Sequence, residues 1–214
     1  MAYSVVPLVA TGDLWTAANH NTYLRDNMAA IWVGTTAGDT DYYTGAANKS
    51  RLALGTAGQI KRVNAAVNAP MWGGIIYGSI YATSDTTVGT AADTLAEMDT
   101  SSVNVDNFVG TPVNDRITIP AGFSGYYLAS YYVVFDADAV GYRAVKLRRN
   151  AGLVDIDGTA VRMTAIAGAP TELSVTTIIH ADAGDYITVC VYQNSGGDLN
   201  TDGVMLSLSL VLGD

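Results

Sequence analysis

The sequence predicts a mainly β protein, in which a short N-terminal region with one helix precedes an antiparallel sandwich or barrel. From Ile75 onward, eight apolar or alternating segments are separated by glycine-marked turns, and none shows a helical period. Hydrophobic residues make up 49% of the 214 residues and charged residues 14%, so the chain can bury a core. The single cysteine, Cys190, excludes an intrachain disulfide framework.

The net charge of −9 is unevenly distributed. Residues 1–75 carry a net charge of +1 and residues 76–214 a net charge of −10. Such a chain lacks the clustered lysines and arginines that neutralise phosphates, so we expect no nucleic-acid partner. No apolar run approaches the roughly 20 residues of a membrane span, and the first residues do not resemble a signal peptide. We therefore expect no membrane insertion, and synthesis in a cytoplasm.

An extended arm and a helix are expected first. Residues 1–12 are short, apolar and contain a proline. Thr16 is a good N-cap, and the segment 17–32 lacks glycine and proline, which predicts a helix. Its apolar stripe repeats every 3.5 residues through Ala17, Asn21, Leu24, Met28 and Ile31. The helix either lies on its own domain or forms a parallel bundle with copies of itself.

A β-turn module is expected next. Residues 34–50 are rich in Gly, Thr, Asp and Asn and predict a loop. Within residues 51–72, short strands near 52–54 and 59–63 flank a glycine turn. Gly73-Gly74 marks the boundary between a region 1–72 and a domain 75–214.

The domain 75–214 is expected to contain strands at 75–81, 115–119, 125–135, 142–149, 159–167, 172–180, 185–193 and 204–212. The long strand 125–135 has no charge on either face. Strands that are apolar on both faces need a second cover, which copies of the same chain would supply; a solvated tyrosine-rich face is the alternative. The residues that we place at subunit interfaces are Leu24, Met28, Ile31, Tyr127, Tyr131, Tyr186 and Tyr192.

The order of these strands resembles the C1q/tumour-necrosis-factor-like jelly roll. The segments that carry the resemblance are 116–135, 145–150, 183–192 and 206–212, which follow the family pattern of strand, Pro-Gly turn, aromatic strand and Gly-Asp turn. Ala151 departs from it by separating Asn150 from Gly152. A long polar loop at 84–102 departs as well. The resemblance implies a ten-stranded jelly roll that assembles into a homotrimer.

The front part resembles the attachment region of tailed-phage fibres and other virion proteins. The segments are Gly12–Ala18, Asn21–Asn27, Leu54–Gln59 and Ala69–Trp72. The resemblance implies that residues 1–72 dock the chain to another virion protein, and the attachment residues we assign are Leu14, Trp15, Tyr23 and Trp72.

Residues that could carry chemistry are sparse. The two histidines, His20 and His180, lie far apart in the sequence, and no Gly-x-Ser-x-Gly motif accompanies them. Cys190 sits in an apolar strand, as a structural thiol does. Asp136 with Asp138, and Asp155 with Asp157, lie two apart near turns as Ca²⁺ ligands can, although aspartate also favours turns. We expect no enzymatic activity, no cofactor and no metal.

Five basic residues cluster within twenty positions: Arg143, Lys146, Arg148, Arg149 and Arg162. They could form a patch for an anionic cell-surface glycan, pair with acidic residues across subunits, or line one solvated face. The polar loops between strands are the other candidate ligand site, and from them we select Asp85, Asp136, Asp138, Asn194 and Asp198.

These observations predict a trimeric structural and adhesion protein of a tailed-phage particle, either a fibre or a receptor-binding protein that contacts a host glycan. The alternative is a capsid decoration protein or head fibre that stabilises the shell. In both cases we expect the mature protein in the virion.

Overall fold

The computed structural model describes residues 16–20, 24, 35–45, 48–64, 66, 68–104, 108–109, 115–150, 152 and 154–213. The chain divides into two compact units, Met1–Gly73 and Gly74–Asp214. We call them the N-terminal unit and the head. Within the described residues, neither contains a helix long and apolar enough to cross a membrane.

The predicted helix is described only at its start, as α1 (Ala17–His20). The Asn19 amide donates a hydrogen bond of 3.2 Å to Thr16 Oγ1, which confirms Thr16 as the N-cap. Leu24 is exposed. The other predicted interface and attachment residues of this segment lie outside the described residues: Leu14, Trp15, Tyr23, Met28 and Ile31.

Two antiparallel hairpins follow in the described part of the N-terminal unit. β1 (Thr40–Gly45) pairs with β2 (Asn48–Leu52), and β3 (Ile60–Val63) pairs with β4 (Pro70–Gly73). The prediction of a loop over 34–50 is therefore wrong. This hairpin was missed because both of its faces are mostly polar and solvent-exposed, so its sequence lacks the alternation that reveals a half-buried strand.

Trp72 closes the predicted β-turn module. Its indole Nε1 donates a 2.6 Å hydrogen bond to the Ala53 carbonyl. A Cβ at Gly55 would lie only 2.6 Å from the Trp72 ring, so glycine is needed where the ring packs. Beside it, the Thr56 amide donates to Gln59 Oε1 at 2.8 Å. Two of the four sequence segments that resemble virion proteins, Leu54–Gln59 and Ala69–Trp72, thus meet in one small module.

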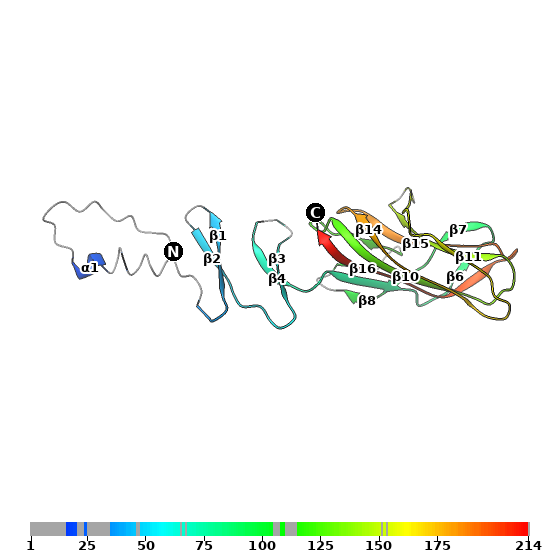
Figure 1. Cartoon of the computed structure of the whole chain (residues 1–214), viewed down its shortest axis with the longest axis horizontal. Helices are drawn as coiled ribbons and strands as arrows, with labels where there is room; N and C mark the ends of the chain where they lie inside the picture. The colour runs from blue at the N-terminus through cyan, green and yellow to red at the C-terminus, as the bar shows by residue number, and fades with distance from the viewer. Residues whose placement is uncertain are drawn as a thin grey trace. The chain divides into compact units, whose positions relative to one another are not determined.

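The head is a two-sheet antiparallel sandwich (Figure 1). One sheet has the order β14-β10-β16-β5-β8, with β6 also paired to β16; the other has the order β12-β11-β15-β9, with β13 paired to β11. The strands are β5 (Tyr77–Tyr81), β6 (Thr86–Val88), β7 (Ala92–Leu95), β8 (Thr100–Asn104), β9 (Ile117–Thr118), β10 (Gly125–Phe135), β11 (Tyr142–Arg149), β12 (Val154–Asp155), β13 (Val161–Thr164), β14 (Thr171–Ala181), β15 (Tyr186–Gln193) and β16 (Leu199–Gly213).

The strand pairs are nested, which confirms the predicted jelly roll. Strand β5 pairs with the last strand, β16; β9 pairs with β15, β10 with β14, and β11 with β13. Consecutive pairs alternate between the sheets, as a long hairpin rolled into a sandwich requires. The predicted long loop at 84–102 instead contains the short strands β6 and β7 and the start of β8.

The core lies between the sheets, and it corrects two predicted interface residues. Tyr127 and Tyr131 are 0% and 1% exposed and point into the core of the single chain, so their assignment to a subunit interface is wrong. Their hydroxyls donate to the carbonyls of Phe123 and Thr159. Burial raises the pKa of Tyr131 to about 12. These hydrogen bonds allow a tyrosine to occupy an interior position that the sequence alone did not identify.

Strand β16 shows where the chain enters the head. Thr201 pairs with Thr86 and Ser209 pairs with Tyr77. The first head strand therefore begins beside the C-terminal end of β16. The loops that precede β6, follow β10 and precede β16 gather at the opposite end, which we call the loop end.

Candidate functional site

The loop end brings together the five predicted ligand residues. Asp85 precedes β6; Asp136 and Asp138 follow β10; Asn194 and Asp198 lie between β15 and β16. The nested pairing places these turns at one end although the first and the last of them are over 100 residues apart in the chain. Asp85 and Asp198 are exposed, whereas Asp136, Asp138 and Asn194 are half-buried.

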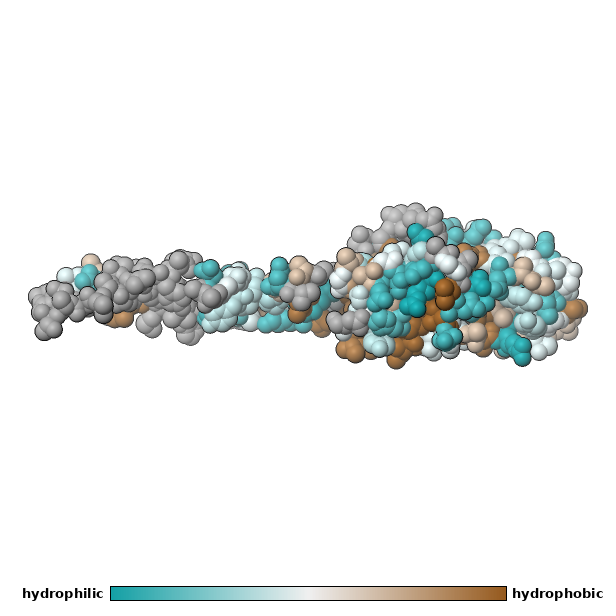
Figure 2. Space-filling view, turned by 90° about the horizontal axis from the view of Figure 1, so that it is seen from above, coloured by the Kyte–Doolittle hydropathy of each residue, from teal (hydrophilic) through white to brown (hydrophobic). Residues whose placement is uncertain are grey.

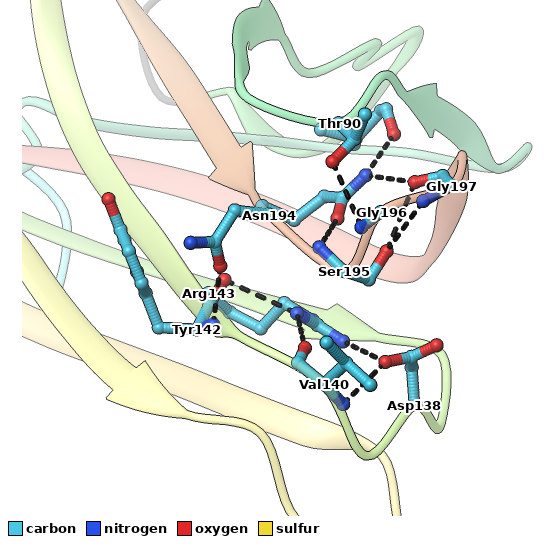
Figure 3. A network of polar contacts seen from close by, with 11 residues as sticks. Thr90, Asp138, Val140, Tyr142, Arg143, Asn194, Ser195, Gly196 and Gly197 are labelled. Carbon is cyan, nitrogen blue, oxygen red and sulfur yellow. Dashed lines mark hydrogen bonds and ion pairs between the residues drawn. The ribbon is translucent and has the colours of Figure 1, made fainter.

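Asn194 has a structural role in this cluster. Its Oδ1 accepts a 2.6 Å hydrogen bond from the Tyr142 amide, which joins the loop before β16 to the loop after β10 (Figure 3). Gly141 has a φ of 76°, and a Cβ there would lie 2.2 Å from Asn194 Oδ1. Because this oxygen already binds backbone, we no longer regard it as a free ligand group.

Gln193, which the sequence did not indicate as a functional residue, links the loop after β15 to the segment after β6 through hydrogen bonds. This fully buried side chain donates from Nε2 to the carbonyls of Val88 and Gly197, at 2.9 and 2.7 Å. Its Oε1 accepts the Ser195 amide at 2.6 Å. The Gly196 amide donates to Thr90 Oγ1 at 3.1 Å. The one feature of the sequence that could have indicated this role of Gln193 is its position as a polar amide at the end of an apolar strand.

Arg143 holds the loop after β10 from inside. It is 0% exposed, and its Nη1 donates to the carbonyls of Val140 and Tyr142 at 3.0 and 3.2 Å (Figure 3). Its Nη2 lies 3.3 Å from Asp138 Oδ1, and that oxygen also accepts the Val140 amide at 2.7 Å. Asp138 therefore serves chiefly as the counterion of a buried arginine. No ligand need be invoked to explain it.

Asp85 lies in a small polar hollow. The hollow has a volume of about 150 Å³ and is lined by residues 82–85 together with Asp202 and Gly203. In the parts of the chain that the structure describes, no three His, Cys, Asp or Glu side chains are grouped as a metal site would require. Roles for Asp85, Asp136 and Asp198 in ligand binding stay predictions.

The predicted basic cluster is largely neutralised within the chain. Lys146 lies 3.0 Å from Asp93 and 2.9 Å from Asp155; Arg148 pairs with the same two carboxylates. The hydrogen bonds from Lys146 and Arg148 lower the pKa of Asp155. Arg149 lies 3.5 Å from Asp185 and Arg143 is buried, so among the described residues of the cluster only Arg162 has no carboxylate partner.

Cys190 is a structural thiol, as predicted. It is 1% exposed, and burial raises its pKa to about 11, so at neutral pH it is protonated. His180 lies 4.0 Å from Asp182.

Tyr186 and Tyr192 are half-buried on the outward face of β15, where the Arg116 guanidinium stacks over Tyr186 and Tyr142 stacks on Tyr192. A subunit contact at either tyrosine stays a prediction.

The outward face of the other sheet is apolar, and brown hydrophobic patches do reach the surface of the head (Figure 2). By strand register and burial, this face, which we call the apolar face, carries the hydrophobic and aromatic side chains of Tyr77, Tyr81, Val103, Tyr126, Leu128, Tyr132, Val134, Ile178, Met205 and Leu212. A row of hydroxyl side chains, Ser79, Ser207, Ser130 and Thr176, crosses it between these residues. Leu128 is 41% exposed, Ile178 60% and Leu212 62%. Ionisable side chains from the described strands reach only its margin, at Glu172, His180 and Asp202.

Comparison with solved structures finds chains of the complement C1q and tumour-necrosis-factor type. The globular domain of zebrafish complement 1qA matches with a TM-score of 0.44 and 10% identity, over 64% of this chain and 98% of that one. The Eiger TNF of S. frugiperda matches with 0.47 and 14%, over 65% and 94%. Murine APRIL matches with 0.46 and 15%, over 63% and 99%. No protein-family model and no curated protein sequence matches.

Proposed function

We propose that the chain is a non-enzymatic homotrimeric structural and binding protein of a tailed-phage particle. Its head presents polar loops, and its N-terminal unit docks the trimer to another virion protein. The observation that carries the proposal is the apolar face of the head, where Leu128, Ile178 and Leu212 are exposed and the described residues provide no cover over them. Contiguous apolar surfaces of this kind on β-proteins mark interaction sites.

Copies of the same chain are the occupant that the charge distribution favours. Residues 76–214 carry a net charge of −10, so two heads can approach closely only through a surface without like charges. The apolar face meets this condition because, among the described residues, its centre has no Asp, Glu, Lys, Arg or His side chain. Its tyrosines, Tyr77, Tyr81, Tyr126 and Tyr132, are residues that interfaces favour. Assembly as a trimer is what the sequence resemblance implies.

The opposite sheet is suited to solvent. Its outward face carries Lys146, Arg148 and Arg162 together with Asp93 and Asp155. This contrast between a charged and an uncharged outer face is expected when only one of the two sheets is covered by neighbours. The proposed interface therefore centres on Leu128 and its neighbours.

The loop end is the proposed binding surface. The chain enters the head beside Tyr77, at the end of the sandwich away from Asp85, Asp138 and Asn194. A trimer would display three rigid copies of these loops, which multiplies weak contacts with a host glycan into avidity. The docking role of the N-terminal unit is supported by the Trp72 module and by its sequence resemblance to virion attachment regions.

The test of self-association is sedimentation velocity on the full chain at micromolar concentration. We expect a species of three times 22.4 kDa. Leu128→Glu places three carboxylates in the interface and should give a folded monomer with an unchanged circular dichroism spectrum. Val154→Glu is the matched control, because Val154 is an exposed apolar residue of the other sheet, and it should stay trimeric. A monomeric parent chain refutes the proposed assembly.

The role in the particle is tested by removing the protein from the virion. Loss of adsorption to host cells, with heat stability of the capsid retained, is the expected result. Capsids that become heat-fragile while adsorption is normal would assign the chain to shell decoration and refute the receptor-binding role.

A further inference from the structure

A groove on the charged sheet of the head has no role in the assembly proposed above. It has a volume of about 450 Å³, within the range of small-ligand sites. Its walls come from β7, β11, β13 and β15, and its lining includes Asp93, Tyr142, Lys146, Arg162, Cys190 and Tyr192. The floor is apolar and closed, since Val145 and Cys190 are each 1% exposed.

An aromatic pair forms one wall of the groove. The rings of Tyr142 and Tyr192 are stacked, with centroids 5.4 Å apart and planes inclined by 21°. A hydrogen bond with Tyr142, together with burial, raises the pKa of Tyr192, so the Tyr192 hydroxyl stays protonated at neutral pH. A flat aromatic surface bordered by hydroxyl groups can contact the C–H face of a sugar ring and hydrogen-bond its hydroxyls.

A cation without an acidic partner lies at the same wall. The Arg162 guanidinium stands over the Tyr142 ring, 5.7 Å from its centroid, and Arg162 has no carboxylate partner among the described residues. The other charges of the groove are balanced, because Lys146 and Arg148 share Asp93 and Asp155. The groove thus has a local charge of +1 on a head whose overall charge is −10, and this favours an anionic ligand.

We propose that this groove binds a hexuronate residue of an acidic polysaccharide. The sugar ring would lie against the Tyr142–Tyr192 pair, the carboxylate would bind Arg162, and Asp93 would accept a hydrogen bond from a sugar hydroxyl. Arginine recognises carboxylates through two parallel hydrogen bonds, which distinguishes a uronate from its neutral hexose. This inference adds a second glycan-binding surface, apart from the loop end, and it rests on the proposed adhesive function for the biological source of the sugar.

The test is saturation-transfer and titration NMR of the full chain with D-glucuronate and D-galacturonate, and with D-glucose and D-galactose as neutral counterparts. We expect the uronates to bind at least about tenfold more tightly than the neutral sugars, the size of one charge-assisted hydrogen bond. Arg162→Gln should remove this preference. Equal binding of neutral sugars, or no binding of either uronate, overturns the proposal.

Arg116→Gln is the matched control. Arg116 also stands over a tyrosine, 4.1 Å from the Tyr186 centroid, and lies outside the groove. It should leave uronate binding unchanged; equal losses in the Arg116 and Arg162 variants would overturn the assignment to the groove. Sedimentation of the same samples separates the two proposals. A trimer that binds no uronate refutes the groove alone, whereas a monomer refutes the assembly whatever the sugar result.

Discussion

The buried pair of Arg143 and Asp138 gives a sharp test of how the loop end is held. Replacing Asp138 by Asn keeps the shape but leaves the guanidinium, which is 0% exposed, without its counterion. Breaking a fully buried pair from one side costs about 3–5 kcal/mol. The Asp138 side chain is 33% exposed, so water moderates the loss, and we expect the free energy of unfolding to fall by about 1–3 kcal/mol.

Replacing Arg143 by Met removes the buried charge instead. Two hydrogen bonds are lost, to the carbonyls of Val140 and Tyr142, while Asp138 can be hydrated in place. We expect a loss of about 1 kcal/mol, smaller than that of Asp138→Asn. The double variant should have the same free energy of unfolding as Arg143→Met, because without the arginine the Asp138 carboxylate has no cation to neutralise.

The assay is urea unfolding at pH 7 followed by tyrosine fluorescence and circular dichroism. The decisive quantity is the order of the three free energies of unfolding. If Asp138→Asn is neutral to within about 0.5 kcal/mol while Arg143→Met costs over 3 kcal/mol, the arginine acts through packing and the electrostatic explanation is refuted.

Three further predictions concern the head. The pKa of Asp155 is lowered, mainly by its hydrogen bond from Lys146, so the ionised carboxylate stabilises the fold above its ordinary pKa of 3.8, and this stabilisation disappears as the pH falls through the lower folded value. The Asp155→Asn variant should therefore unfold at a lower urea concentration than the parent chain at pH 7. At pH 2 the two midpoints should be equal. Gly141→Ala should reduce stability by about 2 kcal/mol or more, measured by thermal unfolding, because the methyl group meets Asn194 in a left-handed turn; an unchanged midpoint would contradict that geometry. Cys190 should react with a disulfide reagent at pH 8 only after denaturant is added, and rapid labelling of the native protein would contradict its burial.

The sequence by itself determined the class of fold. Alternation and glycine turns located β10 and β11 at their observed bounds. Local periodicity is sufficient here because these strands are long and their turns are marked by residues with special backbone preferences. The polar hairpin of β1 and β2 was missed because neither of its faces is buried.

Only the tertiary structure decided which side of β10 is interior. Both faces carry tyrosines and no charge, so Tyr126 and Tyr127 are equivalent by composition. The carbonyl of Thr159, which accepts the hydrogen bond of the buried Tyr131 hydroxyl, comes from a segment 28 residues further along the chain. The same holds for the groove, where β13 and β15 bring Arg162 to the wall that Tyr192 lines. Nonlocal pairing sets such neighbours, and no local pattern in the chain encodes them.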